Sequence, residues 1–272
     1  MACQLFTTHE HATLYEKYMI REPEVYRQFL SYLEEKKGKP FELALDVGCG
    51  TGQTTRALAP HFQKVVGIDI SKTQIQEAER VVYPQNVTYI IASAEQLPLE
   101  DGSVDLITAT TAAHWFNIEE FLREVDRVLK PKGCLALSCS YPHVDLQYKE
   151  CSKQLSEVYN EALNFVVREH ADERIVALVR SEYKYIFDCV PFHDKMRITK
   201  MQGWSTTSVE ALMGFLESTC AFQTFLLTDP ESANEFLKKL QERILKIMGT
   251  SSTDTQLGMC TSHFCVLACK SP

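Results

Sequence analysis

The sequence has no apolar run of the length that a membrane-spanning helix needs, which is ~18 residues. Its N-terminus also lacks the basic start and the apolar block of a signal peptide, so we predict a cytoplasmic location. No C-x-x-C pair occurs among the ten cysteines, and without a secretion signal they do not indicate a disulfide framework. Cys260, Cys265 and Cys269 are the densest group. We interpret them as buried, reduced thiols and expect no metal site.

Positive charge is also in short supply. The chain carries 28 lysine and arginine residues against 36 acidic residues, a formal net charge of −8. A protein of this balance is not expected to bind a polyanion over a broad surface, so nucleic acid is not a predicted partner.

From about residue 41 onward, short apolar runs alternate with turns and helical patterns, which is typical of a parallel sheet with crossover helices. The clearest helix covers 118–129, where apolar residues recur at 3.6-residue spacing. Predicted strands cover 43–47, 65–69, 87–91, 104–108 and 134–139, with further candidates at 195–200 and 264–269.

The rhythm changes after residue 141, where helices are predicted over 148–182, 208–227 and 231–248. We therefore predict one α/β domain over 1–272. Its predicted parts are an N-terminal helical lid (1–40), a ligand-binding core (41–141), a helical cap with one sheet strand (142–250) and a closing strand (251–272).

A glycine-rich turn follows the first predicted strand, with Gly48, Gly50 and Gly52 at alternate positions. Such a turn lets a ligand lie against bare backbone at the start of a helix. Asp46 stands just before it, where a pyrophosphate would be repelled and a cationic ligand favoured. Asp69 ends the second strand, about 20 residues later, at the position that accepts both hydroxyls of a ribose. Taken singly, these residues fit ordinary turns and helix caps equally well; taken together, they indicate a nucleoside site.

Five segments resemble the motifs of the class I S-adenosylmethionine-dependent methyltransferases of the methyltransferase type 11 superfamily. They are Leu45–Gly52, Gly67–Ser71, Ser93–Pro98, Asp105–Ile107 and Arg127–Gly133. The resemblance implies a Rossmann-like, mostly parallel sheet of about seven strands flanked by helices. It implies S-adenosylmethionine as the methyl donor and S-adenosylhomocysteine as the product. The donor would lie against the glycine turn and Ile70, with Asp69 at the ribose, Ala94 and Glu95 beside the adenine, and Thr110 or Thr111 near the sulfonium.

The outer segments resemble the small-molecule carboxyl methyltransferases typified by trans-aconitate methyltransferase. The residues that carry this likeness are Tyr15–Tyr18, Ala113–Phe116 and the stretch from Trp204 to Phe222, which we expect to be helical. The likeness implies that Tyr18 closes a lid over the donor and that the acceptor is a small molecule, methylated on a carboxylate oxygen. We expect a monomer or a weak dimer.

Three further residues are candidates for the acceptor site. A carboxylate is ionised at pH 7 and needs no base, whereas a hydroxyl or amine acceptor would need one, and His114 is the candidate. His114 is equally compatible with lining the pocket, and Trp115 and Trp204 with either walling the acceptor or packing in the core. The alternatives that remain are a methyltransferase acting on tRNA or protein, and a non-catalytic S-adenosylmethionine-binding partner protein.

Overall fold

The computed structural model describes residues 6–19 and 23–272. Its seven strands form one sheet in the order β3-β2-β1-β4-β5-β7-β6, in which β7 runs antiparallel to both of its neighbours and the other pairings are parallel. The strands are β1 (Leu43–Val47), β2 (Lys64–Asp69), β3 (Val87–Ile91), β4 (Val104–Thr110), β5 (Leu129–Gln147), β6 (Asp194–Ser208) and β7 (Gln256–Cys269). The predicted seven-stranded, mostly parallel fold is thereby confirmed.

Helices cover both faces of the sheet. Neighbouring residues of a strand point to opposite sides, so apolar strands give the sheet two apolar faces, and each is buried under helices. Ala44 packs with α2, α3 and α4 on one face, and Leu45 packs with α5 and α8 on the other. The helices, including the short 3-10 turns η1–η3, are α1 (His9–Tyr18), α2 (Pro23–Lys37), α3 (Gln53–Leu58), η1 (Ala59–His61), α4 (Lys72–Arg80), η2 (Ala113–Trp115), α5 (Ile118–Val128), η3 (Lys149–Cys151), α6 (Ser152–His170), α7 (Glu173–Arg180), α8 (Lys184–Cys189), α9 (Val209–Ser218), α10 (Cys220–Thr228) and α11 (Pro230–Met248). No helix of the described ranges is both long and apolar enough to cross a bilayer.

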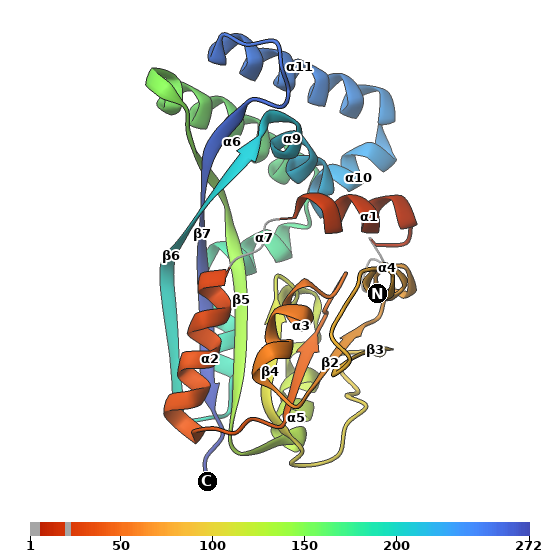
Figure 1. The fold of residues 1–272 in the computed structure, drawn as a ribbon, viewed down its shortest axis with the longest axis vertical. Coiled ribbons are helices and arrows are strands. Elements are labelled where there is room, and N and C mark those ends of the chain that lie inside the picture. The colour runs from red at the N-terminus through yellow and green to blue at the C-terminus, as the bar shows by residue number, and fades with distance from the viewer. Residues whose placement is uncertain (1–5, 20–22) are drawn as a thin grey trace.

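Three strands are much longer than the sequence predicts and carry the cap. β5, β6 and β7 contain 19, 15 and 14 residues and run from the core of the sheet up to α6, α9 and α11 (Figure 1). Val144 and Leu146 on β5 are buried in a separate apolar cluster with these helices and with α10. The cap therefore has an apolar core of its own, built on extensions of the strands that form the sheet.

Several predicted boundaries are wrong. The helix predicted over 148–182 divides into α6 and α7, and the helix predicted over 208–227 divides into α9 and α10. We expected the fifth strand to end at residue 139, but it continues to Gln147 after a shift in register between Ser140 and Val144. We expected a helical stretch from Trp204, but Trp204 lies in β6 and pairs with Cys260 of β7. Strand pairing with β7 stabilises both segments, and neither has an apolar pattern strong enough to show it in the sequence.

The N-terminal segment divides into two parts. α2 is anchored on the sheet, since Val25, Phe29 and Leu33 belong to its core. α1 contacts α4 of the core and α9 of the cap, and Figure 1 shows it lying between them. Cys260, Cys265 and Cys269 are buried, reduced thiols of β7, as expected.

Candidate active site

The carboxyl ends of β1, β2, β4 and β5 open into one cavity of about 1340 Å³ between the sheet and the cap. A single ligand pocket holds ~300–1,000 Å³, so this volume accommodates two small molecules side by side. The cavity is lined by the glycine turn, by α1 and by residues of the cap.

All three glycines of the turn have positive φ angles, between 55° and 80°, which side chains rarely tolerate. At Gly48 a Cβ atom would stand 2.6 Å from Ala112, and at Gly52 it would collide with the Tyr89 ring. At Gly50 the nearest side-chain atoms would be 3.9 Å away, on Gln74 and Tyr15. Gly48 and Gly52 thus shape the turn, and Gly50 presents bare backbone to the cavity.

Asp69 is held at the tip of β2 by two backbone amides. Its Oδ2 accepts from Gly50 N at 2.9 Å and its Oδ1 from Ser71 N at 2.8 Å. Burial raises the pKa of this carboxyl, and the amides of Ser71 and Gly50 oppose that shift. Asp69 lines the cavity with a fixed orientation, as a recognition group for hydroxyls requires.

Asp46 lies deeper, at 1% exposure, and accepts hydrogen bonds from Thr55 Oγ1 at 2.7 Å and Thr108 Oγ1 at 2.8 Å. Burial raises its pKa to about 6. Its two hydroxyl partners tie β1 to α3 and β4, so Asp46 stabilises the turn as well as facing the cavity.

Ile70, Ala94 and Glu95 line one side of the cavity together. Ile70 is 56% exposed, an unusual position for an isoleucine that nothing covers. Glu95 Oε1 accepts from Asn117 N at 2.9 Å, which links this wall to the start of α5. The wall offers an apolar surface next to a carboxylate.

The tyrosine that faces the cavity is Tyr15, not Tyr18. The Tyr18 hydroxyl donates to Glu210 of α9 at 2.6 Å, its ring packs on Gly214, and it lies outside the cavity lining. Tyr15 stands three residues earlier, on the buried face of α1, and belongs to the lining. The two tyrosines are three residues apart, which is less than one helical turn, so they reach different neighbours from the same helix. The geometry therefore favours Tyr15 over the predicted Tyr18 as the residue of α1 that faces a ligand.

Glu16 fastens α1 to the glycine turn. Its carboxylate accepts from Thr51 Oγ1 at 2.6 Å, Gln53 Nε2 at 3.3 Å and Arg56 Nη2 at 2.7 Å. The Glu16 and Arg56 side chains are each 13% exposed, so solvent screens their attraction weakly. Sequence reasoning missed Glu16, although its place inside the tyrosine-rich segment was a usable signal.

His114 lies in η2, at the end of β4, and lines the cavity with 8% exposure. Burial lowers the pKa of its imidazole to about 4, so the ring is neutral at pH 7. Its Nδ1 is 2.6 Å from the hydroxyl of Tyr183, whose pKa burial raises well above 10. In the tautomer with the ring proton on Nε2, Nδ1 accepts from the Tyr183 hydroxyl and Nε2–H can donate into the cavity. The lowered pKa makes the ring a poor base.

Three buried polar atoms near the cavity have no hydrogen-bond partner among the described residues. They are Thr110 Oγ1, Ser138 Oγ and Gln74 Oε1, and Thr110 and Gln74 line the cavity. Thr110 and Ser138 are paired across β4 and β5. Because buried polar groups are normally satisfied, these atoms indicate where ligand groups bind.

The two tryptophans differ. Trp115 lines the cavity beside His114, with their ring centroids 5.4 Å apart. Trp204 is 61% exposed on β6 and is not part of the lining, so its predicted contact with the acceptor has no support in the geometry.

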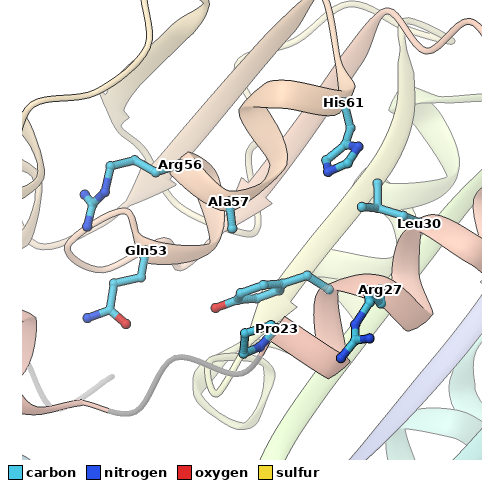
Figure 2. A pocket seen from close by; sticks show the side chains of 8 residues that line it. Pro23, Arg27, Leu30, Gln53, Arg56, Ala57 and His61 are labelled. Carbon is cyan, nitrogen blue, oxygen red and sulfur yellow. The ribbon is translucent and has the colours of Figure 1, made fainter.

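A second hollow of about 510 Å³ lies behind the glycine turn, between α2 and α3 (Figure 2). Its cations are already paired: Arg27 with Glu24, and Arg56 with Glu16 and the Thr51 carbonyl. Figure 2 shows the Arg56 guanidinium turned away from Arg27 and His61. This hollow therefore has little to offer an anion.

Comparisons with known proteins agree on one family. The methyltransferase domain family matches residues 45–137. A methyltransferase homologue of Dictyostelium discoideum is 31% identical over 235 residues, which is 86% of this chain and 82% of the relative. A solved type II methyltransferase of Anaeromyxobacter dehalogenans superimposes with a TM-score of 0.72 at 22% identity, covering 93% of this chain and 99% of that chain. Phosphoethanolamine N-methyltransferase 2 of Haemonchus contortus, solved with S-adenosylhomocysteine, has a TM-score of 0.50 at 17% identity, covering 97% of this chain and 58% of the other.

Proposed function

Because the chain belongs to the class I S-adenosylmethionine-dependent methyltransferases, we propose that it methylates a carboxylate oxygen of a small molecule bound in the cavity. The observation that carries this proposal is the neutral charge of the His114 imidazole at pH 7. A buried, neutral imidazole with a pKa of about 4 is a poor general base for a hydroxyl or an amine at pH 7. An acceptor that arrives ionised needs no base.

The residues around the glycine turn fit the donor. Gly50 has open space in front of its backbone, Asp69 is oriented by two amides, and Gln74 Oε1 has no hydrogen-bond partner among the described residues. When bound, S-adenosylmethionine supplies a methyl group activated by a sulfonium. We assign Asp69 to the ribose hydroxyls.

The other residues that we assign to S-adenosylmethionine lie in the cavity lining near the glycine turn. We assign Ile70, Ala94 and Glu95 to the adenine, and Asp46 to the electrostatic attraction of a cationic ligand. Gln74 Oε1 would accept a hydrogen bond from the donor beside Gly50.

The acceptor would be held by hydrogen-bond donors rather than by a base. His114 Nε2–H and Thr110 Oγ1–H both belong to residues that line the cavity at the end of β4. In-line transfer requires the carboxylate oxygen to face the methyl carbon, and two donors to the carboxylate restrict its rotation. Trp115 and Tyr15 of α1 line the same cavity and would limit the access of water to the reacting groups.

The test is S-adenosylhomocysteine release with a panel of carboxylic acids, phenols and amines. We expect turnover of carboxylic acids at a rate that is nearly constant from pH 6.5 to 8.5, since both the acceptor and His114 have pKa values near 4. His114→Gln should lower turnover less than tenfold, and the exposed control His143→Gln should leave it unchanged.

Other outcomes would replace the proposal. Turnover of phenols or amines alone, rising through pH 6.5 to 7 and lost about 100-fold in His114→Gln, would make His114 a base. Release only with tRNA or protein would make the acceptor a macromolecule. Donor binding without release from any acceptor would indicate a non-catalytic partner protein.

A further inference from the structure

The side of the cavity opposite the donor residues is formed by the cap. We call it the cap wall: the described lining residues between 141 and 263. Most of these residues are aliphatic or aromatic, among them Val167, Ile175, Val176, Val179, Phe215 and Ala221 on α6, α7, α9 and α10. Such a surface binds hydrocarbon and has few groups to recognise a polar skeleton.

Charge is scarce on the cap wall. Between 141 and 263, no lysine or arginine lines the described part of the cavity, and Asp172 is its one acid. Asp172 is exposed and caps α7 by accepting from Arg174 N at 2.8 Å. Lys72, the one basic side chain other than histidine in the described lining, follows directly after Asp69–Ser71 on the donor side.

These two observations restrict the acceptor. A buried carboxylate is costly unless an opposite charge compensates it. The sulfonium of the donor is one positive charge, enough for one carboxylate. A second carboxylate on the same molecule would meet the cap wall, where the described lining residues include no lysine or arginine and the basic side chains are the two histidines His170 and His263.

We propose that the acceptor is a monocarboxylic acid with an extended apolar chain that lies along the cap wall. This inference rests on the proposed carboxylate methylation and adds the class of acid. A lone pair of the carboxylate oxygen forms the new O–CH₃ bond while the S–CH₃ bond breaks. The electron pair of the broken bond stays on sulfur. The products are a methyl ester and S-adenosylhomocysteine, with no proton taken up or released.

The first test is a series of straight-chain monocarboxylic acids from four to fourteen carbons, each compared with the dicarboxylic acid of the same length. Burial of each methylene on the cap wall should raise kcat/KM about two- to fourfold until the chain fills the cavity. The dicarboxylic acids should be at least tenfold poorer. A flat series, or dicarboxylic acids as the better substrates, would overturn the inference while leaving carboxylate methylation intact; absence of turnover with every acid would instead overturn the proposed function.

The second test substitutes one residue of α7. Val176→Phe adds bulk to the cap wall, whereas its neighbour Ala177 is exposed and outside the lining, so Ala177→Phe is the matched control. We expect Val176→Phe to lower kcat/KM at least tenfold for the longest acids and less than threefold for the shortest, with an unchanged dissociation constant for S-adenosylhomocysteine. An equal loss for short and long acids, or no loss for either, would show that the chain lies elsewhere.

Discussion

At the scale of single residues, the strand ends carry the groups that we assign to the donor. The carboxylate of Asp69 is fixed by the amides of Gly50 and Ser71, so it meets a ligand without first losing conformational freedom. Gly50 keeps the space in front of it open. His114, by contrast, is held by a hydrogen bond to Tyr183, and burial keeps its imidazole neutral at pH 7.

Asp69→Ala should weaken S-adenosylmethionine binding at least tenfold, because it removes hydrogen bonds to a charged acceptor that are worth ~1.5–3 kcal/mol each. Calorimetry of the folded variant measures this. Glu79→Ala, which removes an exposed carboxylate of α4, is the control and should bind normally. An unchanged dissociation constant for Asp69→Ala would remove this carboxylate from the donor site.

His114 should make stability depend on pH. Its pKa of about 4 in the folded protein lies below the value of 6.5 that it has when unfolded. Between these values the unfolded state binds the proton and the folded state does not, so stability falls as the pH falls. The contribution is about 3 kcal/mol over this window. Urea unfolding at several pH values should show a shallower decline in His114→Gln; equal slopes would mean that the histidine is not buried in its neutral form.

Among the elements, α1 lines the cavity between the core and the cap. It is held on one side by Glu16, bound to Thr51, Gln53 and Arg56, and on the other by Tyr18, bound to Glu210. The first attachment is to the turn that contacts the donor. Donor binding and closure of α1 are therefore expected to favour each other.

Glu16→Ala should release α1, because Arg56 is left mostly buried without its partner, at a cost of about 2 kcal/mol. Limited proteolysis near Tyr18 should become several times faster. In the wild type, S-adenosylhomocysteine should slow the same cut. Glu10→Ala, an exposed acid in the first turn of α1, is the control. Equal cutting of all three proteins, with and without ligand, would contradict a ligand-ordered lid.

In the whole molecule, β6 is an edge strand of 15 residues. One of its sides pairs with β7, and the other side is a long edge that could pair with a second chain. A register shift between Ile198 and Met201, with Lys200 at a φ of 59°, interrupts this edge. Irregularities of this kind hinder pairing with a second copy.

We therefore expect a monomer at micromolar concentration, and the net charge of −8 also opposes association. Light scattering coupled to size-exclusion chromatography should give a mass near 31.0 kDa. A stable species of twice that mass would show that the interruption of β6 does not protect the edge.

Much of the core was predictable because its signals are local. The turn that holds the donor is encoded by glycines at positions of positive φ, and helix 118–128 by its apolar period and by the Asn117 cap. Asp69 was found because the length of a crossover fixes its distance from the turn.

Other features depend on contacts between distant segments, which no local pattern reports. β5 continues past residue 139 because β7 pairs with it, and Trp204 is in a strand for the same reason. The hydroxyl of Tyr183 bonds to His114 from 69 residues away, and the carboxylate of Glu16 bonds to Thr51 of the glycine turn from 35 residues away.

By itself, then, the sequence determined the parallel core, the donor family and the acids and glycines at the strand ends, because each depends on neighbours within one strand, turn or helix. The tertiary structure decided which face of α1 meets the ligand, the neutral state of His114 and the apolar character of the cap wall. Those properties depend on burial and on the packing of segments far apart in the chain, which exist only once the chain has folded.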